Sequence, residues 1–106
     1  MNNCIFCKIA AGEIPCNKVY EDELVLAYYD INPITPGHTL VIPKAHYENF
    51  LAAPDEVLKE VIVRVKQVAA ILKEKHGFTD YNLQQNNGEK AGQTVMHLHF
   101  HLIPRY

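Results

Sequence analysis

The sequence predicts an α+β domain with about five short, mostly antiparallel strands, one long helix and a short N-terminal helix. Residues 54–76 carry apolar side chains at helical spacing over six turns. Short runs rich in β-branched and aromatic residues, bounded by proline, glycine and asparagine, predict the strands. In the last run, residues 95–103, histidines stand at every second position from 97 to 101, with apolar residues between them. A chain of 106 residues fits a single domain, which we expect to span residues 1–106.

The first elements are short. Residues 4–11 predict a helix that Gly12 ends, and strands are expected at 19–21 and 24–29. Residues 30–37 contain two prolines and predict a loop, and residues 38–43 predict a further strand.

The long helix has the terminal residues that helices favour. Pro54 suits the first helical position, Asp55 and Glu56 suit the positive N-terminal end, and Gly77 suits the C-terminal cap. Its main apolar stripe comprises Val57, Leu58, Val61, Val65, Val68 and Leu72, and Ile62, Val63, Ala69, Ala70 and Ile71 widen it. A helix that is apolar over most of its circumference needs a second cover. In so short a chain we expect another copy to supply it, and therefore a homodimer.

The C-terminal third predicts a strand at 81–85, a polar loop at 86–93 and a final strand at 95–103. Side chains of a strand alternate between its two faces. One face of the final strand would carry Val95, His97, His99, His101 and Ile103, and the other Met96, Leu98, Phe100 and Leu102. We expect the second, wholly apolar face to pack on the long helix, which leaves the histidine face free for function.

Composition excludes several classes of function. The net charge of −2 and the lack of a long basic run argue against a dedicated nucleic-acid binder. No apolar stretch reaches the ~20 residues of a membrane span, and the N-terminus lacks the apolar core of a signal peptide. We therefore expect a cytoplasmic protein. In that compartment the C-x-x-C pair Cys4 and Cys7 indicates metal or redox use rather than a disulfide framework.

Three of the six histidines lie at every second position of the final strand. At a rise of ~3.3 Å per residue, His97 and His101 would lie ~13 Å apart, whereas zinc holds nitrogens at ~2.0–2.1 Å. One ion cannot bind all three unless the chain bends sharply, so the three histidines are expected to have different tasks. The alternative is a solvated polar face on which histidine is merely tolerated.

The segment HLHFHLI at 97–103 matches the H-φ-H-φ-H-φ-φ signature, where φ is apolar, and so resembles the histidine triad (HIT) superfamily. CIFCKIAAGEIP, YEDELVLAYYDINPITPGHTLVIPKAH and NNGEKAGQTVMHLHFHLIPRY resemble, in the same order, a bacterial-type member of its Hint branch. Members of the superfamily are nucleotide hydrolases and transferases that act at the α-phosphate.

The resemblance implies roles for individual residues. His99 resembles the nucleophile, which forms a nucleotidyl-histidine intermediate that water resolves. His101 resembles a contact to the phosphate and leaving-group oxygens, and His38 resembles the fourth family histidine, which orients the site. In sequence, a buried and hydrogen-bonded histidine would look the same as His38.

The resemblance also implies a nucleotide pocket. Asp30 resembles the carboxylate that binds the ribose hydroxyls. The expected phosphate and leaving-group contacts are Asn86, Gly92, Gln93 and Thr94. The walls of the base pocket are expected from Ile5, Phe6, Ile9, Tyr28, Ile31 and Leu40, for which core packing is the competing interpretation.

For the cysteines the resemblance implies a structural zinc site. Many bacterial-type relatives, and the galactose-1-phosphate uridylyltransferases, pair such cysteines with two histidines, which correspond here to His46 and His97. Two cysteines and two histidines are a sound tetrahedral zinc set. The alternative is a pair of reduced cysteines that pack as small apolar residues.

Three functions remain open from the sequence. The first is a phosphoramidase-like hydrolase of a purine nucleoside monophosphate derivative. The second is a dinucleoside polyphosphate hydrolase of the Fhit type. The third is a nucleotide-binding regulatory or scaffold protein whose hydrolysis is incidental.

Overall fold

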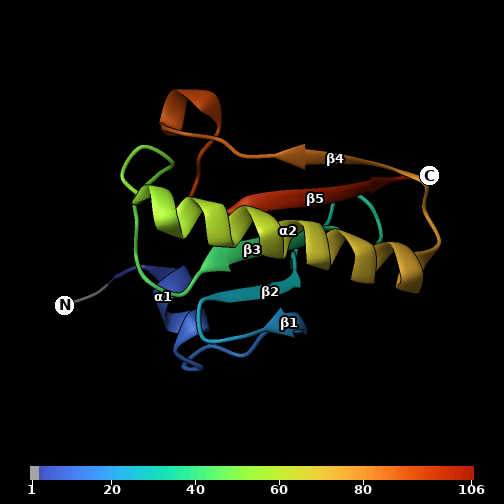
Figure 1. Cartoon of the computed structure of the whole chain (residues 1–106), viewed down its shortest axis with the longest axis horizontal. Helices are drawn as coiled ribbons and strands as arrows, with labels where there is room; N and C mark the ends of the chain where they lie inside the picture. Colours follow the sequence, from blue (N-terminus) through green and yellow to red (C-terminus); the bar gives the residue numbers. More distant parts are fainter. Residues whose placement is uncertain (1–2) are drawn as a thin grey trace.

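A computed structural model describes residues 3–106 and has five strands and two α-helices among them. The elements are α1 (Ile5–Ala10), β1 (Lys18–Glu21), β2 (Val25–Tyr29), β3 (Thr39–Pro43), α2 (Asp55–His76), β4 (Asp80–Gln84), the short 3₁₀ helix η1 (Glu89–Ala91) and β5 (Phe100–Arg105). The strands form one sheet in the order β1-β2-β3-β5-β4, and every neighbouring pair is antiparallel (Figure 1). The predicted fold class is therefore confirmed.

Helix α2 covers one face of the sheet (Figure 1). Alternate residues of the strands meet its apolar stripe in a core built from Val25, Ala27, Val41, Val61, Val65, Val68, Ala69, Leu72, Leu98, Phe100 and Leu102, with Ala53 and Phe78. Pro54 lies just before the helix, and Gly77 ends it with a positive φ of 72° that glycine adopts without strain. No helix within the described residues is long and apolar enough to cross a membrane.

The other face of the sheet has a smaller core under α1. The intervening strand residues Leu26, Tyr28, Leu40 and Ile42 pack there with Phe6, the one buried residue of α1. Sheet alternation thus separates the two cores. The chemistry described below lies on the α1 side, next to the smaller core.

The final strand begins later than the predicted residue 95, at Phe100. Residues 95–97 bend instead, and the Leu98 amide donates to the Tyr47 carbonyl at 2.7 Å rather than to a neighbouring strand. Pro43, at the end of β3, accepts its hydrogen bond from the His97 side chain at 2.8 Å. His97 and His99 therefore precede the strand, and only His101 lies within it.

The bend also changes the predicted apolar face. Leu98, Phe100 and Leu102 pack in the core under α2, as predicted. Met96 does not, since it lies in the bend and is 39% exposed.

Candidate functional site

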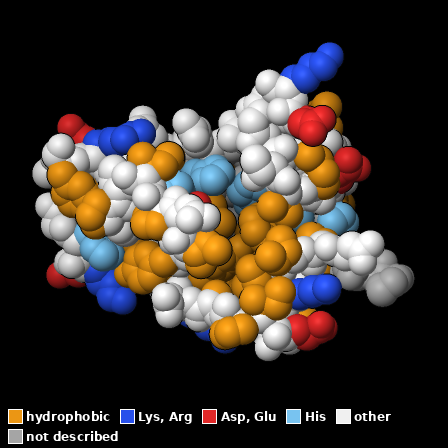
Figure 2. All heavy atoms as spheres, turned by 180° about the vertical axis from the view of Figure 1, so that it is seen from behind, with side chains coloured by type: hydrophobic (Ala, Val, Ile, Leu, Met, Phe, Trp, Pro, Cys, Tyr) orange, Lys and Arg blue, Asp and Glu red, His pale blue; other side chains and the backbone are white. Residues whose placement is uncertain are grey.

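A cavity of about 260 Å³ opens on the sheet face that carries α1. Figure 2 shows this side of the molecule, with histidine side chains in a hollow and hydrophobic side chains beside it. The cavity is lined by Ile5, Phe6, Ile9, Tyr28, Asp30, Ile31, Asn32, Leu40, Thr94, Val95, His99 and His101. All six apolar residues expected around a base lie here, together with the expected ribose carboxylate and two of the three triad histidines.

His99 is held by the backbone just before it. Its Nδ1 lies 2.7 Å from the His97 carbonyl oxygen, which can only accept, so Nδ1 carries the proton. The lone pair of the neutral ring is then on Nε2. Phe6 contacts the same ring edge-to-face, with centroids 5.0 Å apart. Burial lowers the pKa of His99, which disfavours a second proton and keeps the ring neutral at pH 7. A buried, neutral and oriented imidazole is chemically suited to nucleophilic attack.

His101 and His38 form a second pair beside it. His38 Nε2 lies 3.0 Å from His101 Nδ1 and 3.6 Å from an Asp30 carboxylate oxygen. The rings of His101 and His99 have centroids 5.0 Å apart. Burial lowers the pKa of His38, and burial with the charges of His99 and His38 lowers the pKa of His101 to about 4. Both imidazoles are therefore neutral at pH 7.

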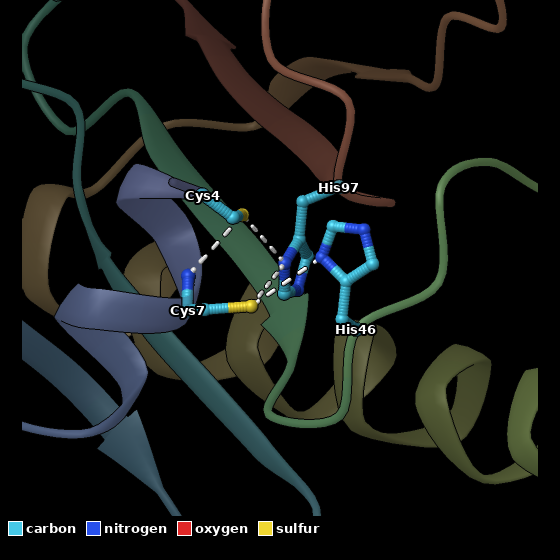
Figure 3. A group of neighbouring side chains, drawn as sticks. All are labelled: Cys4, Cys7, His46 and His97. Atoms are coloured by element: carbon cyan, nitrogen blue, oxygen red, sulfur yellow. Dashed lines mark hydrogen bonds between the residues drawn. The ribbon is translucent and has the colours of Figure 1, made fainter. Parts of the chain in front are cut away.

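The first triad histidine faces away from this cavity and into a cluster with both predicted cysteines. His97 Nδ1 lies 3.2 Å from Cys4 Sγ and 3.5 Å from Cys7 Sγ, and His46 Nδ1 lies 3.3 Å from Cys7 Sγ. The four side chains converge from α1, the segment after β3 and the bend before β5 (Figure 3). The four residues predicted as ligands are thus brought together, and they could hold a metal ion.

The donor set fits a tetrahedral ion. With Zn–S near 2.3 Å and Zn–N near 2.05 Å, a tetrahedral site has N···S edges of about 3.6 Å. The cluster's N···S separations of 3.2, 3.3 and 3.5 Å approach this value. His97 Nε2 donates to the Pro43 carbonyl at 2.8 Å, which leaves Nδ1 unprotonated and turned to the sulfurs. A backbone acceptor of this kind orients metal-binding histidines in general.

Three predicted nucleotide contacts do not line the cavity: Asn86, Gly92 and Gln93. Gly92 has a positive φ of 95° and follows η1, with the Asn86 amide beside it. Gln93 is 1% exposed, and its side chain bonds only backbone groups. Thr94 lies on the cavity wall, as expected of a phosphate contact.

Two cavity residues were not predicted, Asn32 and Val95. Each is one or two positions from a predicted residue, and proximity in sequence was the available signal. The carbonyls of Pro43 and His97 were not predicted either, because a backbone acceptor has no signature in the sequence.

Comparison with known proteins agrees with this geometry. The family model described as the HIT domain matches residues 11–106. The adenosine 5'-monophosphoramidase hnt1 of Schizosaccharomyces pombe is 46% identical over 103 residues, which span 97% of this chain and 74% of that protein. The adenylylsulfatase HINT3 of Arabidopsis thaliana is 42% identical over 104 residues, 98% of this chain and 53% of the relative. A crystal structure of a HIT family protein from Bacillus anthracis matches with a TM-score of 0.95 and 53% identity, over 99% of this chain and 74% of that one.

Proposed function

This chain belongs to the HIT domain family, and from that premise we propose that it is a hydrolase acting at the α-phosphate of a nucleoside monophosphate derivative, with a purine nucleoside phosphoramidate as the substrate class. The observation that carries the proposal is His99, a neutral imidazole on the wall of a cavity that also holds a carboxylate and an apolar pocket. Two relatives named for adenosine phosphoramidate and adenylylsulfate chemistry support it.

In this proposal His99 Nε2 attacks phosphorus and the leaving group departs, giving a nucleotidyl-histidine intermediate. The His99 ring becomes cationic when the new bond between phosphorus and Nε2 forms. Its Nδ1–H already donates to the His97 carbonyl at 2.7 Å, and that hydrogen bond strengthens as the positive charge develops. Water then attacks the intermediate and releases the nucleoside monophosphate.

The rest of the cavity would position the nucleotide. The base would lie between the apolar side chains of α1 and β2, and the ribose hydroxyls would bond Asp30. The amide of Asn32 donates to one Asp30 oxygen at 3.0 Å, which orients the carboxylate and leaves the other oxygen available. His101 and Thr94 would contact the phosphate oxygens.

We assign zinc to the cluster of Cys4, Cys7, His46 and His97 as a structural ion. Four protein ligands complete a tetrahedron and leave no open position, which is the pattern of structural rather than catalytic zinc. The chemistry supplied by zinc here would be cross-linking alone. His97 and the two cysteines would thereby fix α1 against the segment before β5, which carries the nucleophile.

We further propose that residues 1–106 act as one HIT domain and that two copies associate. The apolar side chains of α2 that face away from its own sheet, and the edge strand β4, supply the argument for a homodimer. We also propose a cytoplasmic setting, in which the C-x-x-C pair serves a metal site rather than a disulfide.

Hydrolysis of adenosine 5'-monophosphoramidate by wild type and by His99→Ala tests the function. We expect wild type to release AMP and His99→Ala to lose ~10³-fold or more of kcat, because the nucleophile is missing. His76→Ala is the matched control, since His76 lies at the end of α2 and does not line the cavity.

The alternative functions give different outcomes in the same assay. Preference for a dinucleoside polyphosphate over the phosphoramidate would favour the Fhit-type activity. Tight AMP binding without turnover of either compound would favour a regulatory nucleotide-binding protein. Equal activity of wild type and His99→Ala would remove the nucleophile assignment.

A further inference from the structure

A chain of hydrogen bonds runs from the backbone of the loop between β2 and β3 into the cavity. The Ile34 amide lies 3.1 Å from His38 Nδ1, and His38 Nε2 lies 3.0 Å from His101 Nδ1. His38 is 2% exposed, so water does not compete for these contacts. In this series of hydrogen bonds Ile34 takes part through its backbone amide. That amide decides which group donates and which accepts in each following hydrogen bond.

The direction follows from which groups can donate. A backbone N–H only donates, so His38 Nδ1 must be the unprotonated nitrogen. The proton of neutral His38 is then on Nε2, where the Asp30 carboxylate at 3.6 Å also favours it. Nε2–H donates to His101 Nδ1, which leaves the proton of His101 on Nε2. His101, a wall residue of the cavity, thus presents a donor and not a lone pair.

The same three side chains suggest a rival interpretation, a second metal site. Asp30, His38 and His101 bring one ligand atom each within 4.8 Å of the others. Ligation through His38 Nε2 would move the ring proton to Nδ1, where it would face the Ile34 N–H. Two donors would then oppose each other in a buried place, and neither would have an acceptor. The Ile34 amide therefore disfavours a metal here.

We propose that the backbone N–H of Ile34 is a positioning group that sets the tautomer of His101 through His38, and so fixes His101 as a hydrogen-bond donor to an oxyanion. The inference rests on the proposed function for the identity of that oxyanion, a nucleotide phosphate. No proton is transferred in it. The neutral His38–His101 pair supplies a hydrogen-bond donor to a phosphate oxygen. Within the cavity, the lone pair for nucleophilic attack is on His99 Nε2. Neighbouring imidazoles of one cavity thus take opposite roles.

Long-range ¹H–¹⁵N spectra of the full chain, labelled at histidine, report the proton position on each ring without any substrate. At pH 7 we expect His101 and His38 as the Nε2–H tautomers and His99 as the Nδ1–H tautomer. Two variants break the chain at different points. Ile34→Pro removes the amide proton, and His38→Phe removes the donor to His101. Ile34→Ala keeps the amide and is the matched control.

We expect both chain-breaking variants to give a mixed tautomer at His101 and to weaken AMP binding about 3- to 10-fold, as loss of one hydrogen bond does. Ile34→Ala should keep the wild-type spectrum and affinity. His101 in the Nδ1–H form in wild type, or an unchanged His101 spectrum in a folded His38→Phe, would overturn the inference. So would a second equivalent of zinc that shifts the His38 and His101 resonances. If the spectra show the predicted tautomers but the protein neither binds AMP nor cleaves the phosphoramidate, the proposed function is overturned and the tautomer assignment stands.

Discussion

Gln93 illustrates how one buried side chain can organise a site without facing the cavity. Its amide nitrogen donates to the carbonyls of Glu48 and Val95 at 2.7 and 3.0 Å, and its oxygen accepts from the Gly88 amide at 2.8 Å. Three backbone segments that flank the cavity and the cysteine–histidine cluster are thereby joined. The family resemblance predicts a phosphate or leaving-group contact at this position. That role stays a prediction, because every side-chain hydrogen bond of Gln93 in the structure goes to backbone.

Gln93→Ala should therefore reduce stability strongly. Three backbone groups lose a partner in the interior, so we expect the free energy of unfolding to fall by about 3 kcal/mol. Urea titrations of wild type and variant measure it. Gln67→Ala makes the same change on the exposed side of α2 and should leave the free energy within about 0.5 kcal/mol of wild type. Similar, small effects of both substitutions would contradict a bracing role.

The buried histidine His101 predicts a pH dependence of stability. Its pKa is lowered to about 4, by burial first and then by the charges of His99 and His38, and Asp30 opposes this. A histidine in the unfolded chain titrates near 6.5. Between these pH values the unfolded chain binds a proton here that the folded chain does not. Stability is therefore full above pH ~6.5 and decreases as the pH falls toward 4.

We expect the free energy of unfolding of His101→Gln to depend less on pH between 6.5 and 4.5 than that of wild type. The expected difference in slope is up to about 1.4 kcal/mol per pH unit, the value for one proton. Urea unfolding at several pH values measures both slopes. The other buried histidines are present in both proteins, so the difference reports the proton at His101 together with its coupling to His99 and His38. Parallel curves would refute the prediction.

At the scale of elements, the sequence predicted the existence and type of every α-helix and strand within the described residues, but it misplaced the start of β5. Histidine and apolar residues alternate from Met96 to Leu102, and the pattern alone favours a strand that begins before Phe100. The bend arises from contacts that alternation does not encode, among them Leu98 with the Tyr47 carbonyl and His97 with the Pro43 carbonyl. The apolar walls of the cavity and the cysteine–histidine cluster were predictable because the family motifs identify their side chains by position in the sequence. The backbone acceptors and the Ile34 donor were not.

Helix α1 depends on the cysteine–histidine cluster, which contains its N-cap residue Cys4 and the helical residue Cys7. It has 6 residues, whereas isolated helices shorter than about 12–15 residues are marginal in water. The same helix supplies Ile5, Phe6 and Ile9 to the cavity wall. Loss of the proposed zinc ion should therefore loosen both the cavity wall and the packing of Phe6 on the His99 ring, whose centroids lie 5.0 Å apart.

Cys7→Ser tests this coupling, with Cys16→Ser as the control for a cysteine outside the cluster. We expect Cys7→Ser to lose zinc, to exchange the α1 amide hydrogens faster and to bind AMP about 10-fold more weakly. By thermodynamic reciprocity, AMP should raise the zinc affinity of wild type by a similar factor. Elemental analysis, hydrogen exchange and calorimetry measure the three effects. Zinc loss with unchanged AMP affinity would show that metal binding at the cluster is not coupled to AMP binding in the cavity.

At the scale of the whole molecule, the sheet divides two tasks between its faces. The cavity and the cysteine–histidine cluster lie on the α1 side, while α2 and the larger core lie on the other. Beside α2, the strand β4 is an edge of the sheet (Figure 1). All its residues are exposed. An apolar groove joins the two elements and is lined by Ile62, Val65, Lys66, Ala69, Tyr81, Leu83 and Leu102.

The groove between α2 and β4 is lined mostly by apolar side chains, and contact with a second copy of the chain would remove them from water. The outer edge of β4 has no partner strand within the described residues, and two of its five side chains, Tyr81 and Leu83, are apolar and exposed. Such an edge favours association, and antiparallel pairing of β4 with itself is compatible with a two-fold axis. Such pairing would extend the sheet into the second copy and bring both α2 helices over one continuous surface. The exposed apolar residues of α2, Ile62 and Val63, would then be covered.

Sedimentation equilibrium should accordingly give a mass of about twice the 12.1 kDa chain. Leu83→Lys places a charge in the centre of the expected interface, where Leu83 is 51% exposed in the single chain, and should shift the mass to that of one chain. Leu51→Lys makes the same substitution at a loop residue that is 94% exposed and distant from β4 in sequence, and should leave the dimer intact. Because the cavity lies on the opposite face of the sheet, the monomeric variant should keep its affinity for AMP. A wild-type mass of one chain, or a Leu83→Lys variant that remains dimeric, would show that this groove is not the contact between copies.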